Sequence, residues 1–330
     1  MTSTAKRLGE FELIAKYFAP LARSAPGAFG LQDDAAAFEP TPGHDAVLTT
    51  DAIVAGVHFL ADDPAGTIAQ KALRVNISDL AAKGATPRVY LLTLAMPPSL
   101  DERWLKEFAA GLKRDQARFA ITLVGGDTVA TPGPLTISVT ALGEVPRGKM
   151  LTRGGAQPGD DIWITGTIGD AALGLKIAKG NDLGLSGKQR VAALNRYRVP
   201  EPQLNLGTGL IGIAHAALDV SDGLIADLGH ICDVSGVGIE LQADQVPLSA
   251  AASAALSAGR TTLAELLTGG DDYELAIAAP AASAKKLAAL AERSKTKLTR
   301  IGRVVAGQGV VAIDREGARI RFPRTGFTHF

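Results

Sequence analysis

LDVSDGLIADLGHICDVSGVGIEL, residues 218–241, is the stretch on which the prediction of the fold class rests. Residues 223–234 are an apolar run that predicts a helix, and residues 237–241 predict a short strand. Two carboxylates, Asp219 and Asp222, bracket Val-Ser directly before the helix. Helices and strands that alternate at this spacing are typical of an α/β domain.

The same alternation continues toward both ends of the chain. Strands are predicted at residues 46–50, 89–95, 121–124, 135–145, 162–165, 273–278, 298–304, 309–313 and 319–322. Helices are predicted at residues 67–82, 102–116 (after Asp101 as N-cap), 170–178 and 281–294. The segment PRGKMLTRGGAQPGD, residues 146–160, is rich in Gly, Pro and basic residues, so we expect it to link two α/β domains, 1–147 and 148–330.

Composition narrows the class of protein. A chain of 330 residues is longer than one hydrophobic core usually serves. Lys+Arg and Asp+Glu are each 34, which argues against a general nucleic-acid-binding protein. No stretch reaches the ~18 apolar residues of a membrane span, and Glu10 and Glu12 interrupt the apolar run that a signal peptide needs. The single cysteine, Cys232, rules out an intramolecular disulfide and is expected to pack as a small hydrophobe. We therefore predict a cytoplasmic protein with no nucleic-acid or membrane partner.

Carboxylates recur at the ends of the predicted elements or beside apolar helix positions. They are Asp33, Asp34, Asp51, Asp79, Asp127, Asp219 and Asp222. Helix capping or turn formation explains any one of them. Carboxylates that converge at one edge of a sheet repel one another unless cations bind, and Mg²⁺ takes such oxygen ligands. Zinc is disfavoured because the five histidines have no paired spacing.

Phosphate-binding signals are present but are not of the common kinds. The sequence has no P-loop, no protein-kinase motif set and no G-x-G-x-x-G after a strand. Three segments could contact an anion: Gly125-Gly126, which also reads as a tight turn, the turn at residues 166–170, and the basic linker with Arg147, Lys149 and Arg153.

An ordered set of motifs resembles the thiamine-monophosphate kinase family. The motifs are LQDDAAAF (31–38), TTDAIVAGVHF (49–59), VNISDLAAKGA (75–85), VGGDT (124–128), MLTRGGAQPGD (150–160), TGTIGD (165–170), LDVSDGL (218–224), GGDDYEL (269–275) and GFTHF (326–330). The resemblance runs from about Gly9 to Phe330 and extends to the superfamily of aminoimidazole ribonucleotide synthetase and selenophosphate synthetase. The usual N-terminal cysteine of the selenophosphate enzymes is absent here, since Cys232 stands alone.

The resemblance implies a two-domain α/β (α+β) fold like that of aminoimidazole ribonucleotide synthetase, with N-terminal strands that form a homodimer interface. Domain 1–147 would bind ATP and magnesium and dimerise, and domain 148–330 would complete the active-site cleft. The implied activity is phosphorylation of thiamine monophosphate by ATP, with several Mg²⁺ ions, to give thiamine diphosphate. Another ATP-dependent synthetase of the superfamily and a non-catalytic ATP-binding module remain as alternatives.

The resemblance also implies roles for particular residues. The implied magnesium ligands are Asp33, Thr49, Thr50, Asp51, Asp79, Asp127, Asp219 and Asp222. The implied ATP contacts are Gly126, Asp127, Arg153 and Ser221, and the implied substrate contacts are His58, Asp271 and Phe327. No general base is assigned, because an acceptor phosphate is already ionised at neutral pH.

Three positions depart from the family pattern. Gln32 stands where the family has Gly, and Asp271 stands where it usually has Glu and is one methylene shorter. Phe327 replaces an aromatic that is often Trp or Tyr, so it keeps a stacking face without a polar group.

Overall fold

The computed structural model describes residues 9–328, and these fall into two compact units. The first unit contains the chain up to residue 77 and residues 87–144, and the second contains residues 78–86 and the chain from 145 onward. Residues 329–330 of the terminal GFTHF motif and residues 1–8 lie outside the described part. Within residues 9–328, no helix is long and apolar enough to cross a membrane.

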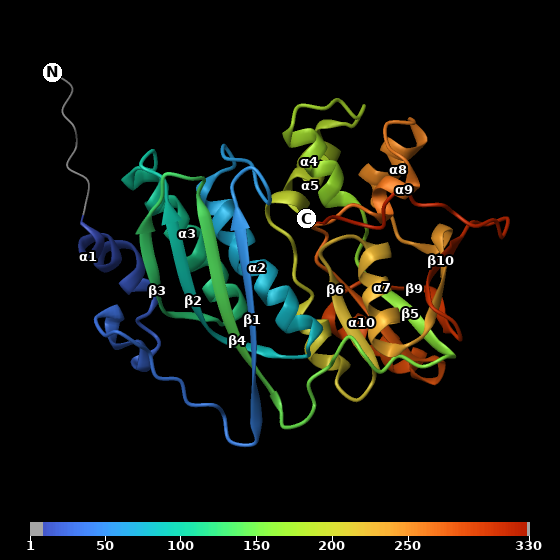
Figure 1. The fold of residues 1–330 in the computed structure, drawn as a ribbon, viewed down its shortest axis with the longest axis horizontal. Helices are drawn as coiled ribbons and strands as arrows, with labels where there is room; N and C mark the ends of the chain where they lie inside the picture. Colours follow the sequence, from blue (N-terminus) through green and yellow to red (C-terminus); the bar gives the residue numbers. More distant parts are fainter. Residues whose placement is uncertain (1–8, 329–330) are drawn as a thin grey trace. The chain divides into compact units, whose positions relative to one another are not determined.

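The first unit is a four-stranded sheet with two long helices on one face (Figure 1). The strands follow the order β1 (His44–Val54), β4 (Thr136–Pro146), β2 (Thr86–Met96) and β3 (Thr122–Ala130). The helices are α2 (Ala65–Ala82) and α3 (Glu102–Phe119). Asp101 caps α3 as predicted, because its Oδ1 accepts the N–H of Trp104 at 2.8 Å. Arg74 of α2 binds Asp115 of α3 in a buried ion pair at 2.6 Å, which fixes one helix against the other.

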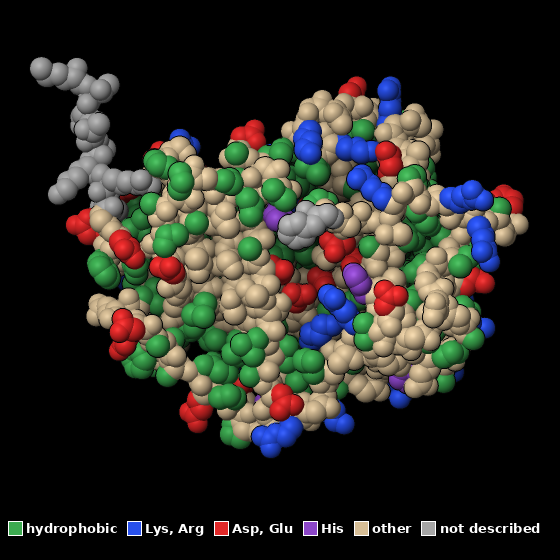
Figure 2. Space-filling model, viewed as in Figure 1, with side chains coloured by type: hydrophobic (Ala, Val, Ile, Leu, Met, Phe, Trp, Pro, Cys, Tyr) green, Lys and Arg blue, Asp and Glu red, His purple; other side chains and the backbone are tan. Residues whose placement is uncertain are grey.

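The opposite face of this sheet is open. Along β2, Leu92 and Leu94 are buried while Leu91 and Thr93 are exposed, as expected for side chains that alternate between a covered and an uncovered face. Figure 2 shows apolar side chains on the surface of this unit. A short helix, α1 (Glu10–Leu13), and several helical turns up to residue 31 precede the sheet.

The Gly125-Gly126 pair does not form a tight turn, so the turn interpretation is wrong. Strand β3 runs through it, paired in parallel with β2, and Val124 is an extra residue where the register shifts. Gly126 has φ 154°, and a Cβ there would lie 1.8 Å from the carbonyl oxygen of Leu92. Only glycine fits this close approach, which is why the pair occurs inside a strand.

The second unit is a six-stranded sheet that is covered on both faces. Its order is β10 (Gly309–Ile313), β7 (Gly238–Gln242), β9 (Leu298–Val305), β5 (Asp160–Thr165), β8 (Glu274–Pro280) and β6 (Ala216–Val220). Neighbouring strands are antiparallel except β10 and β7. Helices α7 (Leu224–Ser235) and α10 (Ala284–Ser294) contribute to two different apolar clusters, one on each side of the sheet. All five residues of β6 are buried as a result.

Several elements of the second unit differ from the sequence prediction. Strand β6 was not predicted, nor were α5 (Gly187–Arg198), α6 (Leu204–Gly207), α8 (Ala250–Ser257) and α9 (Leu263–Leu267). Helix α4 (Asp170–Ala178) has the predicted bounds. The strand predicted at residues 319–322 is wrong, because this segment makes only an isolated bridge between Arg319 and Ile313. Cys232 is buried in the core as predicted, and burial raises the pKa of its thiol to about 11.

Candidate functional site

One cavity of about 1000 Å³ in the first unit gathers three of the predicted site residues. Asp33, Gly126 and Asp127 line it, although about ninety residues of sequence separate the first from the other two. Apolar side chains of the N-terminal segment, such as Phe18, and of the open sheet face, such as Leu91, form the rest of the wall. With Asp34, which also lines it, the cavity combines three carboxylates with an apolar lining, as ligand sites commonly combine a few polar groups with apolar ones.

The predicted ligands on β1 lie on two faces of the sheet. Thr49 and Asp51 alternate with exposed residues, and the N–H of Asp51 donates to Oδ1 of Asn76 in α2 at 3.1 Å. Thr50 points to the open face, where its hydroxyl donates to the carbonyl of Val139 at 3.2 Å. Strands β1 and β3 are the two edges of the sheet, so β4 and β2 separate Asp51 from Asp127. One copy of this unit does not bring these two carboxylates together.

His58 is held at both its ring and its backbone. Its Nδ1 lies 3.0 Å from the N–H of Val54 and accepts that bond, so a neutral ring carries its proton on Nε2. Its carbonyl accepts a bond from Nζ of Lys71 at 2.8 Å, and Lys71 is almost completely buried in α2. These two bonds fix the orientation of the ring and the position of its backbone. Sequence reasoning missed Lys71, whose only signal is a lysine among apolar helix residues.

In the second unit, the turn that follows β6 joins three of the sequence motifs. The carbonyl of Val220 accepts the N–H of Tyr273 at 2.8 Å, and the carbonyl of Ser221 accepts the N–H of Asp271 at 2.8 Å. The carbonyl of Asp222 accepts the N–H of Phe327 at 3.0 Å. The structure thus brings together Ser221, Asp222, Asp271 and Phe327, which were predicted separately as nucleotide, metal and substrate contacts.

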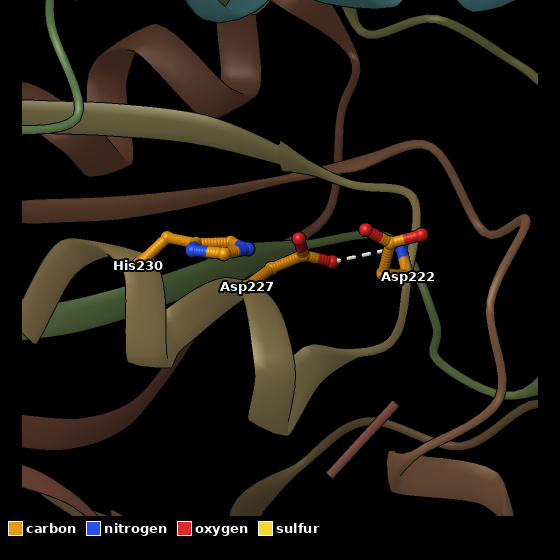
Figure 3. A group of neighbouring side chains, drawn as sticks. All are labelled: Asp222, Asp227 and His230. Atoms are coloured by element: carbon orange, nitrogen blue, oxygen red, sulfur yellow. Dashed lines mark hydrogen bonds between the residues drawn. The ribbon is translucent and has the colours of Figure 1, made fainter. Parts of the chain in front are cut away.

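Asp227 fixes this turn from the first helical turn of α7 (Figure 3). Its Oδ2 accepts the N–H of Asp222 at 3.0 Å and the N–H of Gly223 at 3.1 Å. Burial raises the pKa of Asp227 to about 7, the charge of Asp222 raises it too, and the backbone N–H groups act in the opposite direction. Asp222, Asp227 and His230 offer ligand atoms that lie within 4.8 Å of one another. Neither Asp227 nor His230 was predicted.

Asp271 lies in a strained segment that a buried neighbour holds in place. Asp271 has φ 72° and Tyr273 has φ 51°, values that are uncommon for residues other than glycine. Between them, the carboxylate of Asp272 accepts the N–H of Gly169 at 2.7 Å and the N–H of Ala171 at 3.2 Å. Burial raises the pKa of Asp272 to about 8, against the effect of these N–H groups and of Arg196. The amide of Gly169 in the turn at residues 166–170 and the amide of Ala171 just after it therefore bind a carboxylate of the protein itself. Contact of this turn with an external anion stays a prediction.

Several charged side chains lie close together near the start of β6. Nζ of Lys83 donates to the carbonyl of Ala217 at 3.0 Å, and the N–H of Ala217 donates to the carbonyl of Thr152, next to Arg153, at 3.0 Å. Burial lowers the pKa of Lys83, Asp219 and Asp79 raise it, and Arg153 lowers it. Two predicted metal ligands and one predicted nucleotide contact thus lie within electrostatic reach of one lysine. Lys83 was not predicted as a site residue.

Both halves of the chain are similar to known proteins. The chain matches the family model for the N-terminal domain of AIR synthase related proteins over residues 32–145 and the model for the C-terminal domain over residues 157–315. It is 43% identical over 326 residues to a thiamine-monophosphate kinase of Caulobacter vibrioides, covering 97% of this chain and 90% of the relative. It is 39% identical over 324 residues to a thiamine-monophosphate kinase of Salmonella typhimurium, covering 98% of each chain.

Solved structures give the same likeness. The crystal structure of a thiamine-monophosphate kinase from Stenotrophomonas maltophilia matches with a TM-score of 0.78 and 41% identity, covering 88% of this chain and 91% of that one. A structure described as AaThiL complexed with AMPPCP and TMP matches with a TM-score of 0.78 and 29% identity, covering 99% of this chain and 100% of that one.

Proposed function

The chain belongs to the thiamine-monophosphate kinase family, and on that premise we propose that it transfers the γ-phosphoryl group of ATP to the phosphate of thiamine monophosphate, giving thiamine diphosphate and ADP. One observation carries the proposal: the turn after β6 joins Ser221, Asp222, Asp271 and Phe327 by backbone hydrogen bonds. Each of these residues comes from a motif that resembles the family.

The chemistry of the acceptor explains why no general base is needed. The phosphate of thiamine monophosphate is already ionised at neutral pH, so its oxygen attacks without losing a proton. The obstacle is repulsion between two anions, and catalysis is chiefly positioning and neutralisation of charge. Arg153, which is exposed, and Lys83 supply positive charge from the protein beside Asp79 and Asp219.

We propose that several Mg²⁺ ions take part. The donor set fits this ion, because it consists of carboxylates and threonine hydroxyls, the hard oxygen ligands that Mg²⁺ prefers. Crowding of carboxylates supports the fit, since the charge of Asp222 raises the pKa of its neighbour Asp227. The residues proposed to hold the ions are Asp33, Thr49, Thr50, Asp51 and Asp127 in the first unit, and Asp79, Asp219 and Asp222 in the second. Bound Mg²⁺ would neutralise phosphate oxygens.

The remaining predicted residues are proposed to bind the two substrates. Gly126, Asp127, Arg153 and Ser221 would contact ATP, in keeping with the predicted roles of domains 1–147 and 148–330. His58 and Asp271 would contact thiamine monophosphate. Phe327, held by its backbone at Asp222 and 46% exposed, would stack on a thiamine ring. The thiazolium ring is a cation, so an aromatic face attracts it by about 0.5–2 kcal/mol.

A homodimer is proposed from the open face of the four-stranded sheet. Leu48 on β1 is 66% exposed, and Leu91 on β2 and Val129 on β3 are each 43% exposed. Exposed apolar side chains on a sheet face that neither α2 nor α3 covers favour burial against a second copy of the same face. The cytoplasmic location predicted from the sequence stays a prediction.

Release of ADP in the presence of different acceptors tests the function. With ATP and Mg²⁺, ADP release should depend on thiamine monophosphate and should be much weaker with free thiamine or with no acceptor. An Asp222→Asn chain measured in parallel shows whether contaminating kinases contribute. ADP release that ignores thiamine monophosphate would point to another synthetase of the superfamily, and absence of turnover with bound ATP would point to a non-catalytic ATP-binding module.

A further inference from the structure

The turn at residues 220–223 is fixed on both sides of its backbone. Its carbonyls accept bonds from the N–H groups of Tyr273, Asp271 and Phe327, and its N–H groups at Asp222 and Gly223 donate to one carboxylate, that of Asp227. The turn therefore contains the predicted metal ligand Asp222 and is bonded to the predicted substrate contacts Asp271 and Phe327. A change in its backbone would move all three.

Asp227 is well placed to hold this turn. Its side chain is 3% exposed, and a single oxygen, Oδ2, accepts both backbone bonds. Gly223 has φ 122° and ψ 144°, a conformation that only glycine adopts easily, and a Cβ there would lie 2.8 Å from the backbone of Thr268. A turn of this kind persists when surrounding bonds over-determine it, and the Asp227 carboxylate supplies two of them.

We propose that Asp227 is a positioning residue that couples the metal-binding and substrate-binding parts of the second unit. This inference rests on the proposed function. Asp227 holds the N–H groups of Asp222 and Gly223, and the turn fixed in this way presents the carbonyls of Ser221 and Asp222 to Asp271 and Phe327. Loss of the Asp227 oxygen releases Asp222, Asp271 and Phe327 together, although the last two lie far from Asp227 in the sequence.

The geometry separates this role from direct ligation. The Asp227 oxygen that reaches toward Asp222 is occupied by two backbone N–H groups, whereas the side chain of Asp222 is half-buried. An amide oxygen can accept the same two bonds without carrying a charge. A glutamate keeps the charge but moves the oxygen by one methylene. The variants Asp227→Asn and Asp227→Glu therefore separate the effect of the position of the oxygen from the effect of the charge of the side chain.

Hydrogen exchange measured by mass spectrometry on the full chain, without ligands, tests the coupling. Asp227→Ala should speed exchange by about tenfold or more in peptides covering residues 220–224, 269–275 and 325–328, because all three lose the same support. Asp227→Asn should stay close to the wild type, and Asp227→Glu should resemble Asp227→Ala. The matched control is Asp101→Ala, which removes a capping carboxylate in the first unit and should speed exchange only near the start of α3.

Kinetics supply the second readout. The half-saturating Mg²⁺ concentration and the KM for thiamine monophosphate should both rise about fivefold or more in Asp227→Ala and Asp227→Glu, and should recover in Asp227→Asn. If Asp227→Ala fails to fold, the comparison of Asp227→Asn with Asp227→Glu tests the proposal: both kinetic values should be higher in Asp227→Glu.

Two results would overturn the proposal. Faster exchange confined to residues 220–224 would mean that the turn does not hold Asp271 and Phe327. Loss of Mg²⁺ affinity in Asp227→Asn with normal exchange would make the charge of Asp227 the important property, as for a metal ligand. If no variant and no wild-type sample phosphorylates thiamine monophosphate, the proposed function fails, while the exchange pattern still decides the coupling.

Discussion

The two sheets of the molecule differ in how many of their faces helices cover. The four-stranded sheet has α2 and α3 on one face and an open second face, whereas the six-stranded sheet has α7 and α10 on opposite faces. The predicted site residues follow the same division. Asp33 and Asp127 line a cavity beside the open face. Asp222 and Asp271, in contrast, lie in backbone segments that are hydrogen-bonded to neighbouring segments. The second region is preorganised, and the first depends on what covers it.

The largest effect should come from removing one carboxylate in each region. Asp51→Asn and Asp222→Asn should each lower kcat by at least ~100-fold, about 2.7 kcal/mol of transition-state stabilisation, because each removes a charge that holds a cation. Without ligand, the melting temperature should hold or rise, since repulsion between carboxylates is relieved. Steady-state kinetics at saturating Mg²⁺ measure this, and near-normal kcat in both variants would refute the metal-binding role.

The open face of the four-stranded sheet should be sensitive to an introduced charge. The six-stranded sheet has no such open face. Leu48→Glu should weaken the proposed dimer by roughly 30-fold or more, because a side chain of this size contributes about 2–3 kcal/mol when it is buried. Val191→Glu is the matched control, since Val191 is 57% exposed in the second unit. Sedimentation velocity reads both variants, and a wild-type chain that is monomeric at micromolar concentration would contradict the dimer.

Phe327 tests whether the turn at residues 220–223 positions a side chain that contacts the substrate. Phe327→Ala should raise the KM for thiamine monophosphate several-fold, in line with a lost cation–π attraction of about 0.5–2 kcal/mol, and should leave the KM for ATP within about twofold. The melting temperature should change little, because the side chain is about half exposed. Unchanged KM values together with a melting temperature several degrees lower would make Phe327 a packing residue.

The last effect concerns the pH dependence of stability rather than activity or assembly, and it depends on the buried carboxylate Asp272. Its pKa in the folded chain, about 8, lies above the ordinary value of 3.8, so the folded state binds more protons between these pH values than the unfolded state. Its contribution to the free energy of unfolding is present below about pH 4 and is lost as the pH rises toward 8, by up to about 1.4 kcal/mol per pH unit. Asp272→Asn does not titrate, so its denaturant-derived stability should fall less between pH 5 and 8. Parallel curves for the two chains would contradict the raised pKa.

Elements with a local signal could be predicted from the sequence. Helix α3 was found through its apolar spacing and its Asp101 cap, and α4 through its apolar run after Gly169. Strand β6 was missed because both of its faces are buried and no alternation remains in AALDV. Strand β3 continues through Gly125-Gly126 because its register with β2 overrides a local turn signal.

The site divides in the same way. Resemblance of motifs supplied the residues expected to touch ligands, including Asp222 and Asp271. It did not supply Lys71, Asp227 or Asp272, because these side chains bind backbone groups rather than ligands. Those partners are set by the fold, and Asp272 reaches an amide a hundred residues away. Sequence patterns report local periodicity and cannot show such contacts.

We propose that the γ-phosphoryl group of ATP is transferred to the phosphate of thiamine monophosphate. Phosphorus NMR of the reaction mixture tests it directly, because thiamine diphosphate has two phosphorus nuclei that are coupled to each other. This coupled pair should appear at the rate at which ADP forms and thiamine monophosphate disappears. Formation of ADP and inorganic phosphate with the thiamine monophosphate signal unchanged would contradict it.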